Sequence, residues 1–423
     1  MRSRFHPTSS VRGRAVLLRR ASAIVAALAV GQLAACSPAP PVEYEDWRFD
    51  VPNATPVKEY RQIPPEDGPS NAVRMVEDLV IGGDPDVPET LLYRPRAIVA
   101  SGNGTVYVAD RGAYGIKVYA ADGSYRKTLG QQGQGPGEFE SPRELAIAGE
   151  LLVASDDRNR RFSVWTLEGE HVADHAPAEA RDVSEMFGLA DGTLVWMYST
   201  FHPETGPSAH LVHTTADGLE LGNLLSRAGP PMREVGMDNP AETLQGYLDW
   251  LGDERFLLAV GSGEVVYFSP GRAYQILAMS PDGATRWALR AAGPPLTIPD
   301  AGRQPLIDAF LRNGPWAEVA ADTSGVDMSV VPGDLEWPRI PAIYYLFVDG
   351  AGRLYVFPPP EGAGIVPSET FDVHVYSPDG DYLASGTVPE LWDYAQGDYA
   401  YVIRTAADDD PAVVRYRLTL NGQ

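Results

Sequence analysis

Short runs rich in Val, Ile, Leu, Tyr and Phe alternate along this chain with tight turns built on glycine. Thr105–Asp110 and Gly115–Gly123 are typical of these runs. β-Branched and aromatic residues favour strands, and an X-Gly dipeptide between two such runs favours a hairpin turn, because glycine adopts positive φ without strain. The pattern therefore predicts a long series of antiparallel β-hairpins.

The turns recur in pairs. A single turn glycine is followed 19 to 28 residues later by Asp-Gly, Glu-Gly or Asn-Gly, and this happens six times. The paired glycines are Gly104 with Gly123, Gly149 with Gly169, Gly192 with Gly218, Gly263 with Gly283, Gly352 with Gly380, and Gly397 with Gly422. Two hairpins make one four-stranded unit, so six units predict an all-β, six-bladed β-propeller.

The sixth unit is incomplete. Its strands are expected at about 387–394, 398–405 and 412–420, after which the chain stops. An unpaired sheet edge is a liability, and the segment 72–81 is strand-like without a place in the first unit. We therefore expect residues 72–81 to supply the missing outer strand, so that the propeller domain spans 72–423.

Two short helical insertions are expected around the fourth blade. Asn239-Pro240-Ala241-Glu242 has the form of a helix start, and apolar residues then recur on one face as far as Leu251. A second, weaker pattern runs over about 305–313. Such helices either cover the edge of a blade or form a lid over one face, since amphipathic periodicity indicates burial and not activity.

The N-terminus indicates where the protein resides. Six arginines and no acidic residue precede the apolar run 21–35, which is too short to span a bilayer comfortably. Leu33-Ala34-Ala35-Cys36 resembles the lipobox of bacterial lipoproteins. The resemblance implies a signal peptide over 1–35 and acylation, with palmitate among the lipids, at Cys36. It implies export and anchoring to a bacterial membrane, facing the periplasm from the outer or the inner membrane. Residues 36–71 are rich in proline and are expected to form a tether.

Composition excludes several classes of partner and site. Cys36 is the only cysteine, so neither a disulfide nor a thiolate metal cluster is available. The net charge is −23, and without the six leader arginines 28 basic residues stand against 57 acidic ones, or −29. Such a surface repels nucleic acid and anionic phospholipid, although acidity also serves solubility. We expect a monomer that reaches the membrane only through its lipid.

Two stretches carry a family resemblance. Tyr107-Val108-Ala109-Asp110-Arg111-Gly112 with Ile116–Tyr119, and Val153–Asp156 with Asn159–Trp165, are similar to the NHL repeat. The Gly-rich stretch Leu129–Phe139 resembles the linker between blades in six-bladed propeller lipoproteins of bacteria. The resemblance covers roughly 72–170. It implies a partner-binding propeller, although a minority of related six-bladed propellers are metal-dependent lactonases or lyases.

Three arginines are candidates for ligand binding at the mouth of the central channel. Arg96, Arg143 and Arg339 each follow a proline and precede an expected inner strand, and Glu144 adjoins the second of them. The next turn glycine comes 8, 6 and 13 residues later, so the first two arginines are near-equivalent and the third is out of register. Guanidinium groups match carboxylates, so these residues predict a site for a small anionic molecule or an acidic loop of a protein partner. The alternative is that they pair with acids of neighbouring blades.

No nucleophile motif, zinc spacing or phosphate loop stands out, so catalytic residues are not predicted. The sequence favours a lipid-anchored binding or scaffold module of the cell envelope that needs no cofactor. The alternative is a Ca²⁺-dependent hydrolase, lactonase or lyase. Its metal would be bound by Glu144, Glu185 and Asp393, carboxylates expected near inner strands.

The lipobox gives the first testable prediction. The variant Cys36→Ala has no thiol to acylate, so we expect it to lose labelling by a palmitate analogue and to leave the membrane fraction. Metabolic labelling and fractionation of cells measure both effects. Labelling that persists in the variant would contradict the assignment.

Overall fold

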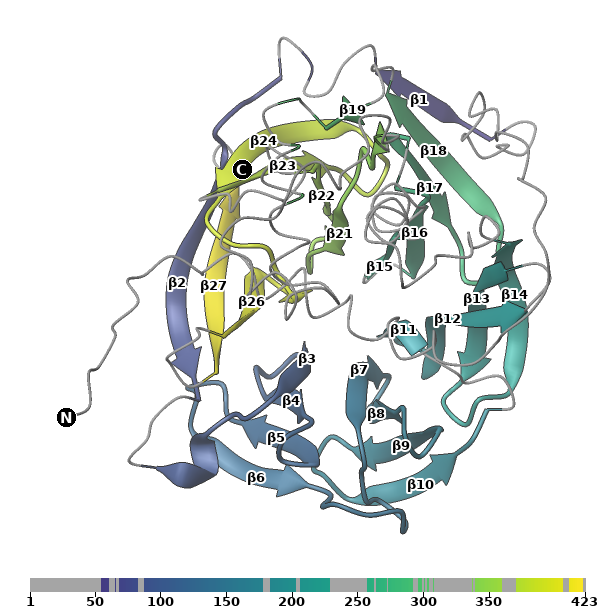
Figure 1. Cartoon of the computed structure of the whole chain (residues 1–423). Coiled ribbons are helices and arrows are strands. Elements are labelled where there is room, and N and C mark those ends of the chain that lie inside the picture. Colours follow the sequence, from purple (N-terminus) through teal and green to yellow (C-terminus); the bar gives the residue numbers. More distant parts are fainter. Residues whose placement is uncertain are drawn as a thin grey trace.

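The computed structural model describes residues 55–60, 65, 68–82, 87–177, 183–202, 206–228, 257–261, 264–271, 273–291, 296–298, 300, 303, 307, 337, 339–359, 370–405 and 411–420. Within them, six antiparallel sheets stand around a common centre as the blades of a propeller (Figure 1). The predicted all-β, six-bladed architecture is therefore confirmed. The two expected helical insertions lie outside the described residues, except for single positions such as the buried Ile307.

The first three blades follow one another along the chain. Blade 1 contains β3 (Pro95–Ala100), β4 (Val106–Asp110), β5 (Gly115–Tyr119) and β6 (Tyr125–Leu129). Blade 2 contains β7 (Pro142–Ala148), β8 (Leu151–Asp156), β9 (Arg161–Thr166) and β10 (His171–His175). Blade 3 contains β11 (Val183–Gly188), β12 (Thr193–His202), β13 (Gly206–Thr215) and β14 (Glu220–Ala228).

The remaining blades include strands from the N-terminal part of the chain. Blade 4 contains β15 (Leu257–Gly261), β16 (Val265–Ser269), β17 (Gln275–Met279), β18 (Thr285–Ala291) and, outside them, β1 (Val57–Tyr60). Blade 5 contains β21 (Tyr345–Val348), β22 (Leu354–Phe357), β23 (Phe371–Tyr376) and β24 (Tyr382–Val388). Blade 6 contains β25 (Tyr394–Gln396), β26 (Tyr399–Arg404), β27 (Ala412–Leu420) and β2 (Val73–Ile81). A 3₁₀ turn (Pro88–Thr90) and the pair β19 (Leu296–Thr297) and β20 (Arg339–Ile340) complete the described elements.

The turn glycines adopt the conformation that the hairpins need. Ten of the twelve paired glycines have φ between 58° and 89°, and the other two, Gly263 and Gly422, lie outside the described residues. A side chain in this region of φ is strained, whereas glycine is not. The recurrence of glycine therefore marks where each blade reverses direction.

Six layers of apolar side chains fill the spaces between neighbouring blades, and each layer draws on two blades. Strand β4 shows how this works. Val106 and Val108 belong to the layer between blades 6 and 1, whereas Tyr107 and Ala109 belong to the layer between blades 1 and 2. Because alternate side chains point to opposite faces of a sheet, a strand with neighbours on both sides needs apolar residues at every position.

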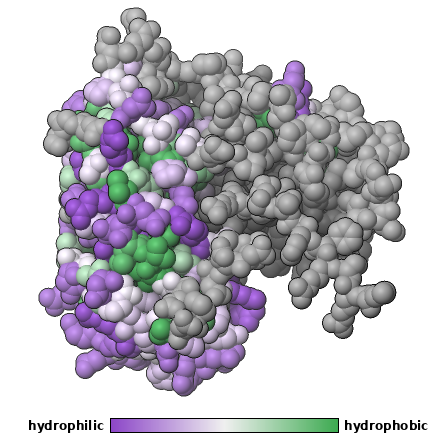
Figure 2. Space-filling view, turned by 90° about the vertical axis from the view of Figure 1, so that its left-hand side faces the viewer, coloured by the Kyte–Doolittle hydropathy of each residue, from purple (hydrophilic) through white to green (hydrophobic). Residues whose placement is uncertain are grey.

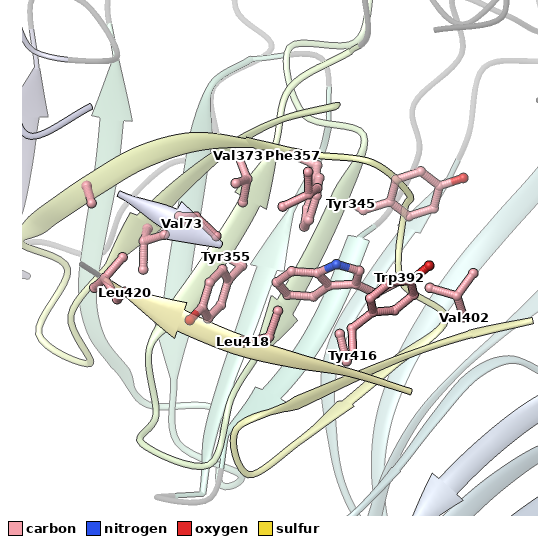
Figure 3. Close-up of a cluster of buried hydrophobic side chains, with 14 of the residues drawn as sticks. Val73, Tyr345, Tyr355, Phe357, Val373, Trp392, Val402, Tyr416, Leu418 and Leu420 are labelled. Carbon is pink, nitrogen blue, oxygen red and sulfur yellow. The ribbon is translucent and has the colours of Figure 1, made fainter. Parts of the chain in front are cut away.

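The ring closes through the strand expected to close it. β2 pairs antiparallel with β27, from Val73 opposite Leu420 to Ile81 opposite Val413, so the two ends of the propeller share one sheet. Figure 3 shows the layer between blades 5 and 6, where Val73, Leu418 and Leu420 pack near Tyr355 and Trp392. The Trp392 ring lies 5.0 Å from that of Tyr355, edge to face, and Trp392 is 2 % exposed.

Part of the expected tether belongs to the folded body. β1 lies parallel to the outer strand β18 of blade 4, and Tyr60 Oη accepts a hydrogen bond from the backbone N–H of Tyr382 in blade 5 at 3.0 Å. Lys58 forms an ion pair with Asp381. Further along, the Pro69 carbonyl accepts a hydrogen bond from Ser385 N–H at 2.9 Å. Residues 57–60 and Pro69 of the expected tether thus contact blades 4 and 5. The strand was not expected, because four residues after a proline are too short to stand out as one.

The outer face of β2 combines apolar and charged side chains. Val76 and Val80 are 59 % and 49 % exposed, while Arg74, Glu77 and Asp78 lie among them in the same strand. Figure 2 looks onto the side of the molecule where β2 lies and shows an apolar patch bordered by hydrophilic residues. The strand register shifts between Glu77 and Leu79. Charges and an irregular register both discourage pairing with another exposed edge.

A buried histidine lies between blades 4 and 5. His374 is 6 % exposed, and its Nδ1 lies 3.0 Å from the hydroxyl of Tyr274, which in turn lies 3.0 Å from that of Tyr376. Burial lowers the pKa of His374 to about 4. The imidazole is therefore neutral in the folded protein at pH values where the unfolded chain binds a proton.

Truncation from the N-terminus tests how much of the N-terminal segment the folded propeller needs. Removing residues 37–54 keeps every described contact, so we expect an unchanged thermal midpoint. Removing 37–60 takes away β1 and the Tyr60 contacts and should lower the free energy of unfolding by about 2 kcal/mol. Removing 37–82 also deletes β2 and should abolish the cooperative melt. Equal midpoints for the three proteins would refute this ring closure.

Acid should destabilise the propeller through His374. Its folded pKa of about 4 lies below the usual value of 6.5, so stability is present above pH 6.5 and is lost as the pH falls towards 4. Between pH 7 and pH 5 this single group should reduce the free energy of unfolding by about 2 kcal/mol. His374→Gln keeps a polar side chain without this titration, so denaturant unfolding should show a smaller loss. An equal loss in both proteins would contradict the role of His374.

Candidate functional site

Two buried aspartates shape the chain just before the first two inner strands. Asp110 ends β4, and its carboxylate accepts hydrogen bonds from the backbone N–H groups of Tyr93 (2.9 Å) and Arg94 (2.7 Å). Asp156 ends β8 and accepts two such bonds, both at 2.9 Å, from the residues that precede β7. Both side chains are out of contact with solvent. The aspartate of the NHL-like stretches thus serves the fold, because it satisfies backbone donors that the strands leave unpaired.

The inner strands β3 and β7 begin with the same irregularity. The proline that opens each strand pairs with the buried aspartate, and the register then shifts, as it does in a β-bulge. Arg96 and Arg143 directly follow these prolines, so they occupy equivalent positions in successive blades. A bulge redirects the side chains it contains and is common next to binding sites. The structure therefore bears out the expected equivalence of these two arginines.

Three arginines of blades 1 and 2 lie near enough to Arg111 to lower its pKa. These three are Arg94, Arg143 and Arg158, and together with Arg111 they are named here the arginine cluster. The backbone N–H of Arg111 donates to the carbonyl of Arg94 at 3.0 Å. Burial lowers the pKa of Arg111, Asp157 raises it, and the other three arginines lower it. Like charges disfavour one another's ionised form, so this part of an acidic protein concentrates positive charge.

Asp157 and Glu144 both contact Arg143 of this cluster, and Asp157 is the nearer of the two. Its Oδ2 lies 3.0 Å from Nη1 of Arg143, and the two side chains are 21 % and 20 % exposed. Glu144 Oε1 lies 3.7 Å from Nε of the same arginine. Arg94 and Arg158 are exposed, and Arg111 is half-buried. The cluster is thus open to solvent while one of its members is held by an acidic neighbour.

The carboxylates of the alternative calcium site have other surroundings. Glu144 belongs to the acidic neighbours of Arg143, and Asp393 Oδ2 accepts a hydrogen bond from the backbone N–H of Ile403 at 2.6 Å. Glu185 lies on the inner strand β11, where the register also shifts. Across the described ranges, no three His, Cys, Asp or Glu side chains gather closely enough to hold a metal ion.

Two other expected sites fall elsewhere. Arg339 lies in β20, which pairs with β19, and the inner strand β21 begins only at Tyr345. Arg339 therefore does not share the position of Arg96 and Arg143, because it opens a strand of a separate two-stranded sheet. Cys36 lies outside the described residues.

The Gly-rich linker before blade 2 is held by the other residues of the NHL-like stretch. Asn159 Nδ2 donates to the carbonyl of Gly133 at 3.0 Å. Arg161 Nη2 donates to the carbonyls of Gly135 (2.7 Å) and Glu138 (2.6 Å). These side chains bind carbonyl groups of the linker, so the linker is a structural turn between blades 1 and 2, as the sequence predicted.

Sequence reasoning missed Arg94, Arg111, Arg158 and Asp157. Each follows or precedes a residue that the sequence did mark, since Arg111 and Asp157 come directly after the buried aspartates. Aligning the first two units on those aspartates would have shown that Arg111 and Asp157 occupy equivalent positions of the repeat. That the two side chains lie near each other could not be predicted, because it depends on the angle between the two blades.

Comparisons with known proteins identify no family for this chain. No protein-family model matches the chain, and no curated protein matches it in sequence. Among solved structures, similarity extends to a DUF4221 family member from Bacteroides vulgatus (TM-score 0.49, 11 % identity, covering 84 % of this chain and 99 % of that one). A candidate exported protein from Bacteroides fragilis gives a TM-score of 0.47 at 11 % identity, covering 86 % and 99 %. A gluconolactonase from Xanthomonas campestris gives 0.39 at 12 % identity, covering 82 % and 97 %.

Within the described ranges, the structure has no helix with the length and apolar character required to cross a bilayer.

Proposed function

We propose that this protein is a lipid-anchored binding module of the bacterial envelope, and that its arginine cluster binds a carboxylate-bearing ligand. The ligand is a small organic acid or an acidic loop of a partner protein. The lipobox-like sequence at Cys36 supports the anchoring, and the cluster supports the ligand class. Two observations carry the proposal: Arg143 of the cluster already holds a carboxylate, that of Asp157, at 3.0 Å, and three arginines of two successive blades act on Arg111.

The fold explains the backbone conformation at the arginine cluster, but it does not explain why arginines occupy these positions. The buried aspartates and the shifted register fix the backbone of both inner strands, and neither requires a guanidinium group at the cluster positions. A folded chain with 57 acidic and 34 basic residues has few arginines to place, and mutual repulsion disfavours gathering them. An anionic ligand relieves that repulsion, since guanidinium groups bind carboxylates through two parallel hydrogen bonds.

The position of the cluster suits recognition. It lies at the start of inner strands, where the blades converge on the centre of the ring, and a propeller commonly binds ligands near its channel. Exposed arginines also attract anions from a distance, so association should depend on ionic strength. A partner with an acidic segment would meet this face in preference to the rest of an acidic surface.

Charge removal tests the proposal. Binding of citrate, by calorimetry, and of a fluorescent hexaglutamate peptide, by anisotropy, is compared for wild type and for Arg111→Gln/Arg158→Gln. We expect wild-type binding that weakens as salt rises, and an affinity lower by on the order of tenfold in the double variant. The matched control is Arg74→Gln/Arg126→Gln, because both of its arginines are exposed on outer strands. Equal affinities in the two double variants, or no binding of either probe by wild type, would overturn the proposal.

A further inference from the structure

We propose that Asp157 occupies the ligand position of the arginine cluster in the free protein, and that the carboxylate of an incoming ligand replaces it at Arg143. This inference rests on the proposed function and specifies how the same site is regulated. The starting observation is the contact between Asp157 Oδ2 and Arg143 Nη1 at 3.0 Å. Chemically, this contact is what a bound carboxylate would make.

The repeat itself shows that the fold does not need a carboxylate at position 157. Asp157 follows the buried Asp156 as Arg111 follows the buried Asp110. In both blades the backbone N–H of this residue donates to the carbonyl just before the strand-opening proline, at 3.0 Å for Arg111 and 3.2 Å for Asp157. The same backbone position therefore accepts either sign of charge. The backbone does not require a negative side chain there. The charge of Asp157 instead acts on the neighbouring arginines, because it pairs with Arg143 and raises the pKa of Arg111.

The pair borders the solvent, since about a fifth of each side chain is exposed. Leaving Arg143 without a carboxylate would be costly, because the pair is otherwise buried. Asp157 can therefore leave only as a second carboxylate takes its place. Glu144 approaches the same arginine from its Nε side at 3.7 Å, so Arg143 keeps an acidic neighbour while the Nη1 side changes partner. Asp157 thus acts as a tethered competitor that sets the concentration at which a ligand binds.

Removing the competitor should strengthen binding. Asp157→Asn keeps the size of the side chain and removes its charge, so we expect citrate and hexaglutamate to bind roughly tenfold more tightly at low salt. The difference should narrow as salt rises, because it is electrostatic. Asp157→Glu retains a carboxylate and should bind much as wild type does. Asp282→Asn is the matched control, since it changes the net charge equally at an exposed turn of blade 4.

The outcomes separate this inference from the proposed function. Binding by wild type without tighter binding by Asp157→Asn would overturn the exchange and leave the proposed function standing. Equal tightening in Asp157→Asn and Asp282→Asn would also overturn it, because net charge alone would then explain the effect. No binding of either probe by wild type or by Asp157→Asn would refute both. A thermal melt of each variant confirms that the proteins compared are folded.

Discussion

The packing of apolar side chains between neighbouring blades is the interaction on which this structure depends. No blade can bury both of its faces alone, so each one is stable only between two others. Six layers satisfy this condition, and the sixth exists because β2 completes blade 6 from the N-terminal side. The candidate site between blades 1 and 2 depends on this ring, because the angle between adjacent blades determines which loops lie next to each other.

The same constraint explains how much the sequence revealed. Turn glycines and continuous apolar strands recur in every unit, so the six-bladed fold and the closing strand could be predicted. β1 could not, because four residues that pair in parallel with β18 carry no periodic signal of their own. The spacing of the turn glycines already placed Arg339 out of register, and it lies in a separate two-stranded sheet. Arg96 and Arg143 share one position of the repeat.

The candidate site contains two kinds of residue: those whose side chains stabilise the backbone of the repeat, and those that can differ from blade to blade. Asp110, Asp156, Asn159 and Arg161 bind backbone groups, and their side chains are used up in holding loops. At the position after each buried aspartate, blade 1 has arginine and blade 2 has aspartate, on the same backbone hydrogen bond. Repeats of similar backbone thus create an asymmetric surface, and chemistry can differ between blades without cost to the ring.

The attachment of β1 has a mechanical consequence for an anchored protein. If Cys36 carries a lipid, tension between membrane and propeller reaches β1 before it reaches the ring-closing β2. β1 is held by a four-residue pairing, the ion pair of Lys58 and the contacts of Tyr60, whereas β2 pairs along nine residues. β1 would therefore detach first. Its release, together with the chain up to residue 72, would lengthen the tether by roughly 50 Å while the ring stayed closed.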